Sequence, residues 1–321
     1  MKTLFTLANI TSAFFVGLVA LTATSAHAEI AWKKDLSERV NLTPVDKVDK
    51  ATTELDADLR PRKKSSARED DFSASSSESD STLAGNPGNT RNEDFQSTKK
   101  ILLRQVYFDH PQTLYCGFTF DRRTKEVDLP SGFRAPAHQE RANRIEWEHV
   151  VPAEHFGQAF PEWRDGSGRC INEKGHFYKG RRCADRLSRE YRLMQSDMYN
   201  LFPAVGAVNA MRSNYPYRML DGVPSTFGVC EMKVTDRWAE PPERARGRIS
   251  RAMLYMDAVY HKRYHLSDRQ RRLAESWNAQ YPVDAWECIR SARIEKLQGN
   301  PNPFVKDACL KEGLPYTTRG K

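Results

Sequence analysis

The stretch RIEWEHVVPAEHFG, residues 144–157, holds three carboxylates and two histidines. Apolar and charged residues alternate through 145–151, which is typical of a short β-strand. A strand points successive side chains to opposite faces, so Glu148 and His149 can share a site only at a strand end or bulge. The stretch therefore predicts a strand that ends in a polar cluster. A metal site, a proton-transfer site and a solvated surface are the alternatives.

The C-terminal third contains three predicted helices. Apolar residues recur at helical spacing within 246–264. The second helix begins after a Ser267–Gln270 capping box and stops before Pro282. The third begins at Asp284 and ends at Gly299, a residue that commonly stops helices. Trp277 and Trp286, which lie in the second and third helices, are predicted to anchor the core.

The middle of the chain is less periodic. Residues 193–200 are predicted to be helical, with Pro203 interrupting or restarting the helix. Residues 165–182 are rich in glycine and charge and predict a long loop. Together with the predicted strand, these elements indicate a single helix-rich domain of the α+β class.

The N-terminal part divides into two segments. Residues 1–28 combine Lys2, an apolar run and a final Ala-His-Ala, which predicts a secretory signal peptide cleaved near Ala28. Residues 29–95 are rich in Ser, Asp, Glu and Lys and predict a low-complexity, disordered linker. The folded domain is therefore expected at 96–321. No segment outside the leader approaches the ~20 apolar residues of a membrane span, so no membrane partner is expected.

The charge of the predicted domain differs from that of the linker. The chain carries a formal net charge of +8, and residues 1–95 contribute −3, which leaves +11 for residues 96–321. A basic domain on an acidic tether suggests an anionic partner such as nucleic acid, although solubility alone is the simpler explanation.

All six cysteines lie in the basic domain, behind the predicted signal peptide. An even number in an exported chain indicates disulfides, and the absence of a C-x-x-C pair argues against a zinc ribbon. The sequence leaves fifteen pairings open, and Cys170–Cys183 is the favoured local one. The cysteines are Cys116, Cys170, Cys183, Cys230, Cys288 and Cys309.

A second stretch, MQSDMYNLFPAVGAVNAMRSNYPY at 194–217, supplies amides and an arginine. Asparagine is a suitable Mg²⁺ ligand beside one carboxylate and several waters. Glu148 and Asn200 holding one Mg²⁺ beside a neutral His149 would form a compact phosphodiesterase site. His149 would accept a proton from water and an arginine would bind the phosphate.

These segments resemble the endonuclease I family of bacterial periplasmic and secreted nucleases. The resemblance rests on EWEHVVPA, SDMYNLFPAVGAVNAMRSN, CEMKV, EPPERARGRISRAMLYM and YPVDAWECIRSARIEKLQGNPNPFV, in the family's order from about Ile101 to Cys309. It implies a ββα-metal (His-Me finger) motif and cleavage of DNA, and of RNA, without sequence preference. It also implies one Mg²⁺ per site, for which Mn²⁺ can substitute, in an expected monomer that is periplasmic or secreted.

The resemblance also implies roles for individual residues. His149 would be the general base, Glu148 a metal ligand, and Asn200 the second ligand, on the helix of the ββα unit. The family's phosphate-contacting arginine lies just before a cysteine in a Gly-Arg-rich loop, which favours Arg181. Gly166–Tyr178 resembles an extension of that loop, so Arg169 and Arg182 remain alternatives.

Several other polar residues keep two interpretations. Asn209, Arg212 and Asn214 either position a helix end or contact the nucleic acid. Glu146, Glu154 and His155 are expected to play supporting parts, with Glu146 orienting Arg144 or a backbone amide. The arginines of RARGRISR either form a solvated face or contact phosphates; they are Arg244, Arg246, Arg248 and Arg251.

Two other functions use the same residues. The chain could be a secreted nucleic-acid-binding protein that kept the fold without catalysis, or a metallohydrolase of another phosphodiester. The intact Glu148, His149 and Asn200 set favours the nuclease over both.

Overall fold

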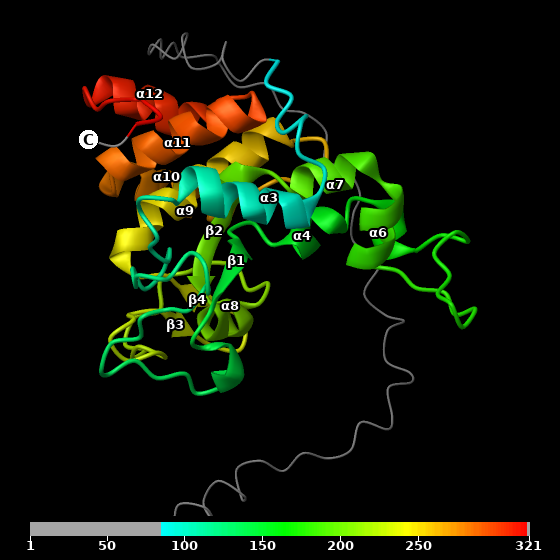
Figure 1. The fold of residues 1–321 in the computed structure, drawn as a ribbon, viewed down its shortest axis with the longest axis horizontal. Helices are drawn as coiled ribbons and strands as arrows, with labels where there is room; N and C mark the ends of the chain where they lie inside the picture. The colour runs from blue at the N-terminus through cyan, green and yellow to red at the C-terminus, as the bar shows by residue number, and fades with distance from the viewer. Residues whose placement is uncertain (1–84, 320–321) are drawn as a thin grey trace, which may run out of the picture. The chain divides into compact units, whose positions relative to one another are not determined.

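The computed structural model describes residues 85–319, which form a mixed α+β structure (Figure 1). The predicted signal peptide and most of the predicted linker lie outside the described residues. Between residues 85 and 319, no helix combines the length and apolar character that a membrane crossing requires.

Two short antiparallel strands lie at the centre of the molecule. Strand β1 (Ile145–His149) pairs with β2 (Leu201–Val205), so that Glu146 lies opposite Ala204 and His149 opposite Leu201. Helix α8 (Gly206–Arg212) follows β2 without a loop. Every residue of β2 is buried, because helices cover this pair of strands (Figure 1).

The C-terminal helices form a compact group on one side of the strands (Figure 1). They are α9 (Glu243–Val259), α10 (Asp268–Gln280), α11 (Ala285–Gln298) and α12 (Pro303–Lys311). Ser267 and Asp284 cap α10 and α11 through bonds to the Gln270 and Glu287 amides, and Gly299 adopts a left-handed φ of 89° at the end of α11. The three predicted helices are therefore confirmed, with α9 beginning three residues early. The anchor prediction also holds: Trp277 is buried, and Trp286 packs half-buried against the core.

The remaining elements surround the pair of strands β1 and β2. Before it come α3 (Phe95–Ile101), the π-helical turn η1 (Leu102–Val106) and the 3₁₀ turn η2 (Gln139–Arg141). After β1 come α4 (Ala153–Gly157), α5 (Pro161–Arg164), α6 (Arg181–Leu187), α7 (Arg189–Gln195) and the 3₁₀ turn η3 (Met198–Asn200). A second small sheet pairs β3 (Lys233–Val234) with β4 (Ala239–Glu240).

Two local predictions for the middle of the chain are wrong. The helix expected at 193–200 ends at Gln195, because Asp197 caps a separate 3₁₀ turn through the Tyr199 amide. Pro203 does not interrupt a helix. It lies within β2, opposite Trp147, and its carbonyl accepts from the Leu114 amide.

The six cysteines form three disulfides. Cys170–Cys183 confirms the favoured local pairing, and Cys116–Cys230 and Cys288–Cys309 complete the set. These bonds span 13, 114 and 21 residues respectively, so they tie together both neighbouring and distant parts of the domain. None of the cysteines is free.

The described structure begins before the expected start of the domain. The Asn89 side chain donates to the Leu193 carbonyl at 2.7 Å, and its amide donates to the Tyr260 hydroxyl at 2.9 Å. Glu93 accepts from Arg189 at 2.5 Å and also pairs with Arg192. Residues 85–94 therefore pack against α7 and the end of α9.

The arginine run at the start of α9 is structural. Arg251 is buried and pairs with both oxygens of Glu287, at 2.7 and 2.6 Å. Arg246 pairs with Glu240 at 2.9 Å, and Arg248 pairs with Asp284. Only Arg244 of the four is exposed. Arg246, Arg248 and Arg251 therefore form neither a solvated face nor a set of free phosphate contacts, because each pairs with a carboxylate, while both alternatives stay open for Arg244.

Candidate active site

His149 lies at the end of β1, with its ring held in one orientation. The ring packs between Phe95 and Phe156, with centroids 5.1 and 6.4 Å away. Nε2 lies 2.8 Å from the carbonyl oxygen of Gln195. A carbonyl only accepts, so Nε2 carries the proton and the Nδ1 lone pair is left for another partner. Burial, with the nearby charge of Arg181, lowers the pKa of His149 to about 3.

A cavity of about 450 Å³ opens beside this ring. Its wall includes His149, Arg181, Glu146 and Asn209, from β1, the start of α6 and α8. The cavity therefore joins the predicted base and the favoured phosphate-binding arginine with a carboxylate and an amide.

Glu146 is the carboxylate on this wall. It accepts from Asn209 Nδ2 at 2.9 Å and from Arg141 Nε at 2.8 Å, while Arg144 stays 3.8 Å away. Burial alone would raise the pKa of Glu146, but the bonds from Arg141 and Asn209 outweigh it and hold the pKa below its usual value. A Cβ at Gly206 would lie 2.5 Å from the Arg141 carbonyl oxygen, so only glycine permits α8 to approach this closely.

Glu148, the predicted metal ligand, lies in a different environment. It is 2 % exposed, and one of its oxygens accepts from the Tyr115 hydroxyl at 2.6 Å and from Arg212 at 2.7 Å. Arg212 also donates to the carbonyls of His149 and Val150. Burial raises the pKa of Glu148, against the opposing effect of Arg212. This carboxylate is absent from the wall of the cavity beside His149.

Asn200, the predicted second ligand, is fully buried. Its Oδ1 accepts from the Val151 amide at 2.7 Å and its Nδ2 donates to the Val151 carbonyl at 2.9 Å. It lies at the end of η3, immediately before β2. The expected position of Asn200 on an α-helix is therefore wrong, and α8, the helix that directly follows β2, carries Asn209 instead. The side chain of Asn200 fixes the turn that follows β1.

The cavity beside His149 is surrounded by positive charge. It adjoins a second hollow of about 470 Å³, with which it shares Lys100, Leu103 and Lys125. The pKa of Lys99 is lowered, first by burial and then by the charge of Lys125, which shows how closely the cations are crowded. We call this surface the basic groove. Its cations are Lys99, Lys100, Arg104, Arg122, Arg123, Lys125, Arg141 and Arg181.

The other predicted nucleic-acid contacts are dispersed. Arg169 and Arg182 are exposed but do not line the cavity, and Arg182 stacks on Tyr178 at 4.8 Å. The Asn214 amide donates to the Glu154 carboxylate. Arg212 is 1 % exposed, so it positions β1 and cannot reach a phosphate on the surface.

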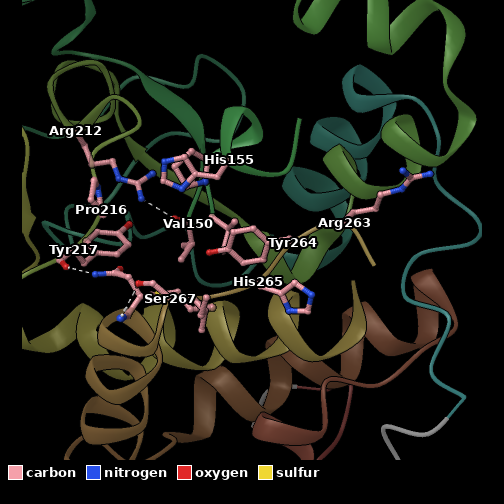
Figure 2. A pocket seen from close by; sticks show the side chains of 14 residues that line it. Val150, His155, Arg212, Pro216, Tyr217, Arg263, Tyr264, His265 and Ser267 are labelled. Carbon is pink, nitrogen blue, oxygen red and sulfur yellow. Dashed lines mark hydrogen bonds between the residues drawn. The ribbon is translucent and has the colours of Figure 1, made fainter. Parts of the chain in front are cut away.

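A further cavity of about 420 Å³ lies beside the turn after β1 (Figure 2). Figure 2 shows Arg212 and His155 above it and Tyr264 and His265 on its opposite side. His155 is thus half-buried, and burial followed by the charge of Arg212 lowers its pKa. The residues that line this cavity include no carboxylate, so it lacks the oxygen ligands that Mg²⁺ prefers. The cavity beside His149 is the better candidate.

The comparisons with known proteins show the family of the chain. A model of the Endonuclease I family matches residues 90–309. The chain belongs to the endonuclease I family. An extracellular deoxyribonuclease of Aeromonas hydrophila is 42% identical over 221 residues, which cover 67% of this chain and 90% of the relative.

Two further relatives of this endonuclease I chain are also nucleases by name. A periplasmic deoxyribonuclease of Aeromonas hydrophila is 41% identical over 67% of this chain and 86% of the relative. Endonuclease-1 of Buchnera aphidicola is 36% identical over 68% of this chain and 85% of the relative. The family match over residues 90–309 includes β1, β2, α8 and the residues of the basic groove.

Two residues on the wall of this cavity, Glu146 and Asn209, have only weak signals in the sequence. The sequence predicts that Glu146 orients Arg144 or a backbone amide, but it bonds to the side chains of Arg141 and Asn209 instead. Asn209 was one of several asparagines in its stretch. The sequence nevertheless contains a signal for Asn209. A helix that directly follows a buried strand points its first turn at the neighbours of that strand. Asn209 is the only polar residue between Gly206 and Met211.

Proposed function

We propose that this protein is an exported nuclease that hydrolyses phosphodiester bonds of DNA, and of RNA, without reading sequence. The observation that carries the proposal is His149, whose Nε2 is fixed by the Gln195 carbonyl so that Nδ1 is free beside a basic groove. Lysine and arginine contacts to the phosphate backbone carry no sequence information, which suits cleavage at any site. The relatives named as extracellular and periplasmic deoxyribonucleases support both substrate and export.

We further propose that β1, β2 and α8 form the ββα-metal unit, with Glu146 and Asn209 as the residues that hold Mg²⁺. A carboxylate and an amide oxygen, completed by waters, fit this ion. Glu148 and Asn200 fit it less well, because both are buried and neither lines the cavity beside His149, whereas Glu146 and Asn209 lie on its wall. Mg²⁺, when bound, supplies charge that polarises the scissile phosphate and stabilises the leaving oxygen.

The protein's own residues carry the rest of the reaction. Nδ1 of His149 accepts a proton from the attacking water, whose oxygen forms the new bond to phosphorus as the bond to the 3′ oxygen breaks. The Gln195 carbonyl accepts a hydrogen bond from the imidazolium that results, as it does from the neutral ring. Arg181 binds the phosphate, and the lysines of the groove hold the strand.

Plasmid digestion by the oxidised, mature protein tests the proposal. We expect cleavage with Mg²⁺, none with EDTA, and a loss of about 10²- to 10⁴-fold in rate for His149→Ala. His155→Ala is the matched control and should retain the wild-type rate. A His149→Ala protein that digests as fast as wild type would rule out the general base.

The metal assignment has its own test with a readout besides activity. Mg²⁺ that binds the folded protein raises its melting temperature. This increase should disappear in Glu146→Gln and in Asn209→Ala. Glu148→Gln should still show an increase above its own metal-free value. If the increase is lost in Glu148→Gln and kept in Glu146→Gln, the two carboxylates have been assigned the wrong way round.

A further inference from the structure

Residues 166–180 form a projecting arm next to the candidate active site. The Ile171–Phe177 bridge and the bond from the Tyr178 amide to the Cys170 carbonyl, 2.9 Å long, make the arm a narrow antiparallel loop. The Cys170–Cys183 disulfide fastens its base to α6. Figure 1 shows the loop before α6 extending away from the rest of the domain. A stapled loop of this kind holds a fixed shape without a core of its own.

The arm exposes an apolar pair. Phe177 is 72 % exposed, more than any other large apolar side chain that the structure describes, and Ile171 is 41 % exposed. These two residues lie directly opposite each other in antiparallel pairing, which places their side chains on the same face. An aromatic ring held out into solvent on a stapled loop contributes nothing to the core and is available for contact with a partner.

The surroundings of this pair are cationic. Arg169, Lys174 and Lys179 are exposed on the arm, and Glu173 is its only acidic residue. Arg182, at the base, stacks on Tyr178. Proteins that bind single-stranded nucleic acid combine cations along the backbone with aromatic rings on which bases stack. The arm has both components, and an anionic strand complements its charge.

The arm is continuous with the basic groove. Arg181, which lines the cavity beside His149, directly follows its last residue. Phe177 is four residues from Arg181, so the chain separates them by at most about 14 Å. At about 3.4 Å per nucleotide, the spacing along one strand of a stacked duplex, this reach corresponds to roughly four nucleotides, and to fewer along an extended single strand. A strand bound at Arg181 therefore passes the arm within a few nucleotides of the scissile phosphate.

We propose that the arm is a binding site for unpaired nucleotides, in which Phe177 stacks on a base of the strand whose phosphate is held at Arg181. The inference rests on the proposed nuclease function and deepens it. It makes single-stranded DNA a preferred substrate, because a base inside a duplex has no free face to offer.

Binding of a fluorescent single-stranded 12-mer to the inactive His149→Ala protein tests the proposal. In that background Phe177→Ala should weaken binding by between about 5-fold and 100-fold, the range found when one stacking residue is removed. Phe177→Trp should restore the affinity, because indole also stacks. Leu310→Ala, which removes a side chain that is 60 % exposed on α12, should bind like the parent. Binding of a blunt duplex should change much less than binding of the single strand.

The charges of the arm give a second readout. Arg169→Ala with Lys174→Ala should reduce the salt dependence of single-strand binding by about 0.7 in log–log slope for each phosphate that these side chains neutralise. Equal affinity of Phe177→Ala and the parent, or equally weakened binding in Phe177→Ala and Leu310→Ala, would overturn the inference. So would a Phe177→Ala protein that loses binding to anionic lipid vesicles while oligonucleotide binding stays intact.

Cleavage by the otherwise wild-type protein separates this inference from the proposed function. A protein that cleaves no nucleic acid with Mg²⁺ contradicts the proposed function itself. A protein that cleaves DNA, and whose Phe177→Ala variant keeps the parent's KM for a single-stranded 12-mer, contradicts only the arm. We expect KM to rise in this variant while kcat stays constant, because Phe177 does not touch the reacting atoms.

Discussion

Glu146 and Glu148 lie two residues apart on one strand, yet their environments are opposite. Glu146 faces a cavity, bonds to Asn209 and Arg141, and has a lowered pKa. Glu148 is buried between Tyr115 and Arg212, and burial raises its pKa. The comparison teaches that one residue type, at two positions of the same strand, can line a cavity at one position and stabilise the buried structure at the other.

The buried residues around Glu148 hold the backbone of β1 in place. Arg212 connects Glu148 with the carbonyls of His149 and Val150, and therefore fixes the backbone from which the His149 ring projects. Asn200 performs the same task for Val151. The open side, which contains Glu146, His149 and Asn209, can then present side chains to a substrate without having to stabilise the strand itself.

Truncating each glutamate should produce the largest contrast between the two sides. Glu148→Ala leaves the Arg212 charge buried without its carboxylate, so we expect the free energy of unfolding to fall by about 3–5 kcal/mol. Glu146→Ala breaks a partly exposed pair and should cost at most about 1 kcal/mol. Urea unfolding at neutral pH measures both values, and the digestion rate should fall in Glu146→Ala although its fold is intact.

The double variant Glu148→Ala with Arg212→Ala provides the control. Removing both partners leaves no unpaired charge, so its loss of stability should be smaller than the sum of the two single losses. Equal losses of stability in Glu146→Ala and Glu148→Ala would erase the distinction between the open and the buried side.

The disulfides allow a second comparison of the two sides. Cys116–Cys230 adjoins Tyr115 on the buried side and closes 114 residues, whereas Cys170–Cys183 fastens the arm and closes 13. Loop-closure entropy gives about 4.7 kcal/mol for a loop near 100 residues and about 3 kcal/mol for one near 15. The Cys116→Ser/Cys230→Ser pair should therefore lower the free energy of unfolding by roughly 1–2 kcal/mol more than Cys170→Ser/Cys183→Ser.

Activity should separate the same two variants in a different way. Loss of Cys170–Cys183 should weaken single-strand binding through the arm while most of the stability remains. Loss of Cys116–Cys230 should reduce the folded fraction and, with it, all activity. The reverse pattern would show that the arm supports the fold.

Much of the helical fold was predictable because the signals are local. Ser267, Asp284 and Gly299 act within three residues of the helix ends that they define. The end of α7 at Gln195 was not predictable in this way, because Asp197 caps the next turn and also accepts from Tyr255 and Tyr260, about 60 residues away. The prediction that Pro203 interrupts or restarts a helix is wrong for the same reason, because its pairing with the distant strand β1 places it in a strand.

The site was predictable only in part. The motif predicts a base and an arginine, and the structure places His149 and Arg181 on the wall of one cavity. The choice between Glu146 and Glu148 depends on Tyr115 and Arg212, which lie 33 and 64 residues from Glu148. The choice between Asn200 and Asn209 depends on which of them bonds to the Val151 backbone. Such tertiary partners leave no periodicity or spacing in the sequence.

The smallest effect that we expect is the change of kcat/KM with pH near neutrality. Burial and Arg181 lower the pKa of His149 to about 3, so the ring remains neutral far below the ordinary histidine value of about 6.5. We therefore expect kcat/KM to stay nearly flat from mildly alkaline pH to about pH 5. A profile that bends near pH 6.5 would mean that His149 titrates like a solvated histidine, or that another group is the base.

The lowered pKa of His149 also predicts how the stability of the protein depends on pH. Unfolded His149 binds a proton below about pH 6.5, whereas the native ring does not until about pH 3. The stability that the buried neutral ring contributes is thus complete above pH 6.5 and is lost progressively as the pH falls towards 3. The difference in unfolding free energy between wild type and His149→Gln should decline over this window. Arg181→Ala should make the decline smaller, because removing a neighbouring positive charge lets the native ring accept a proton at higher pH.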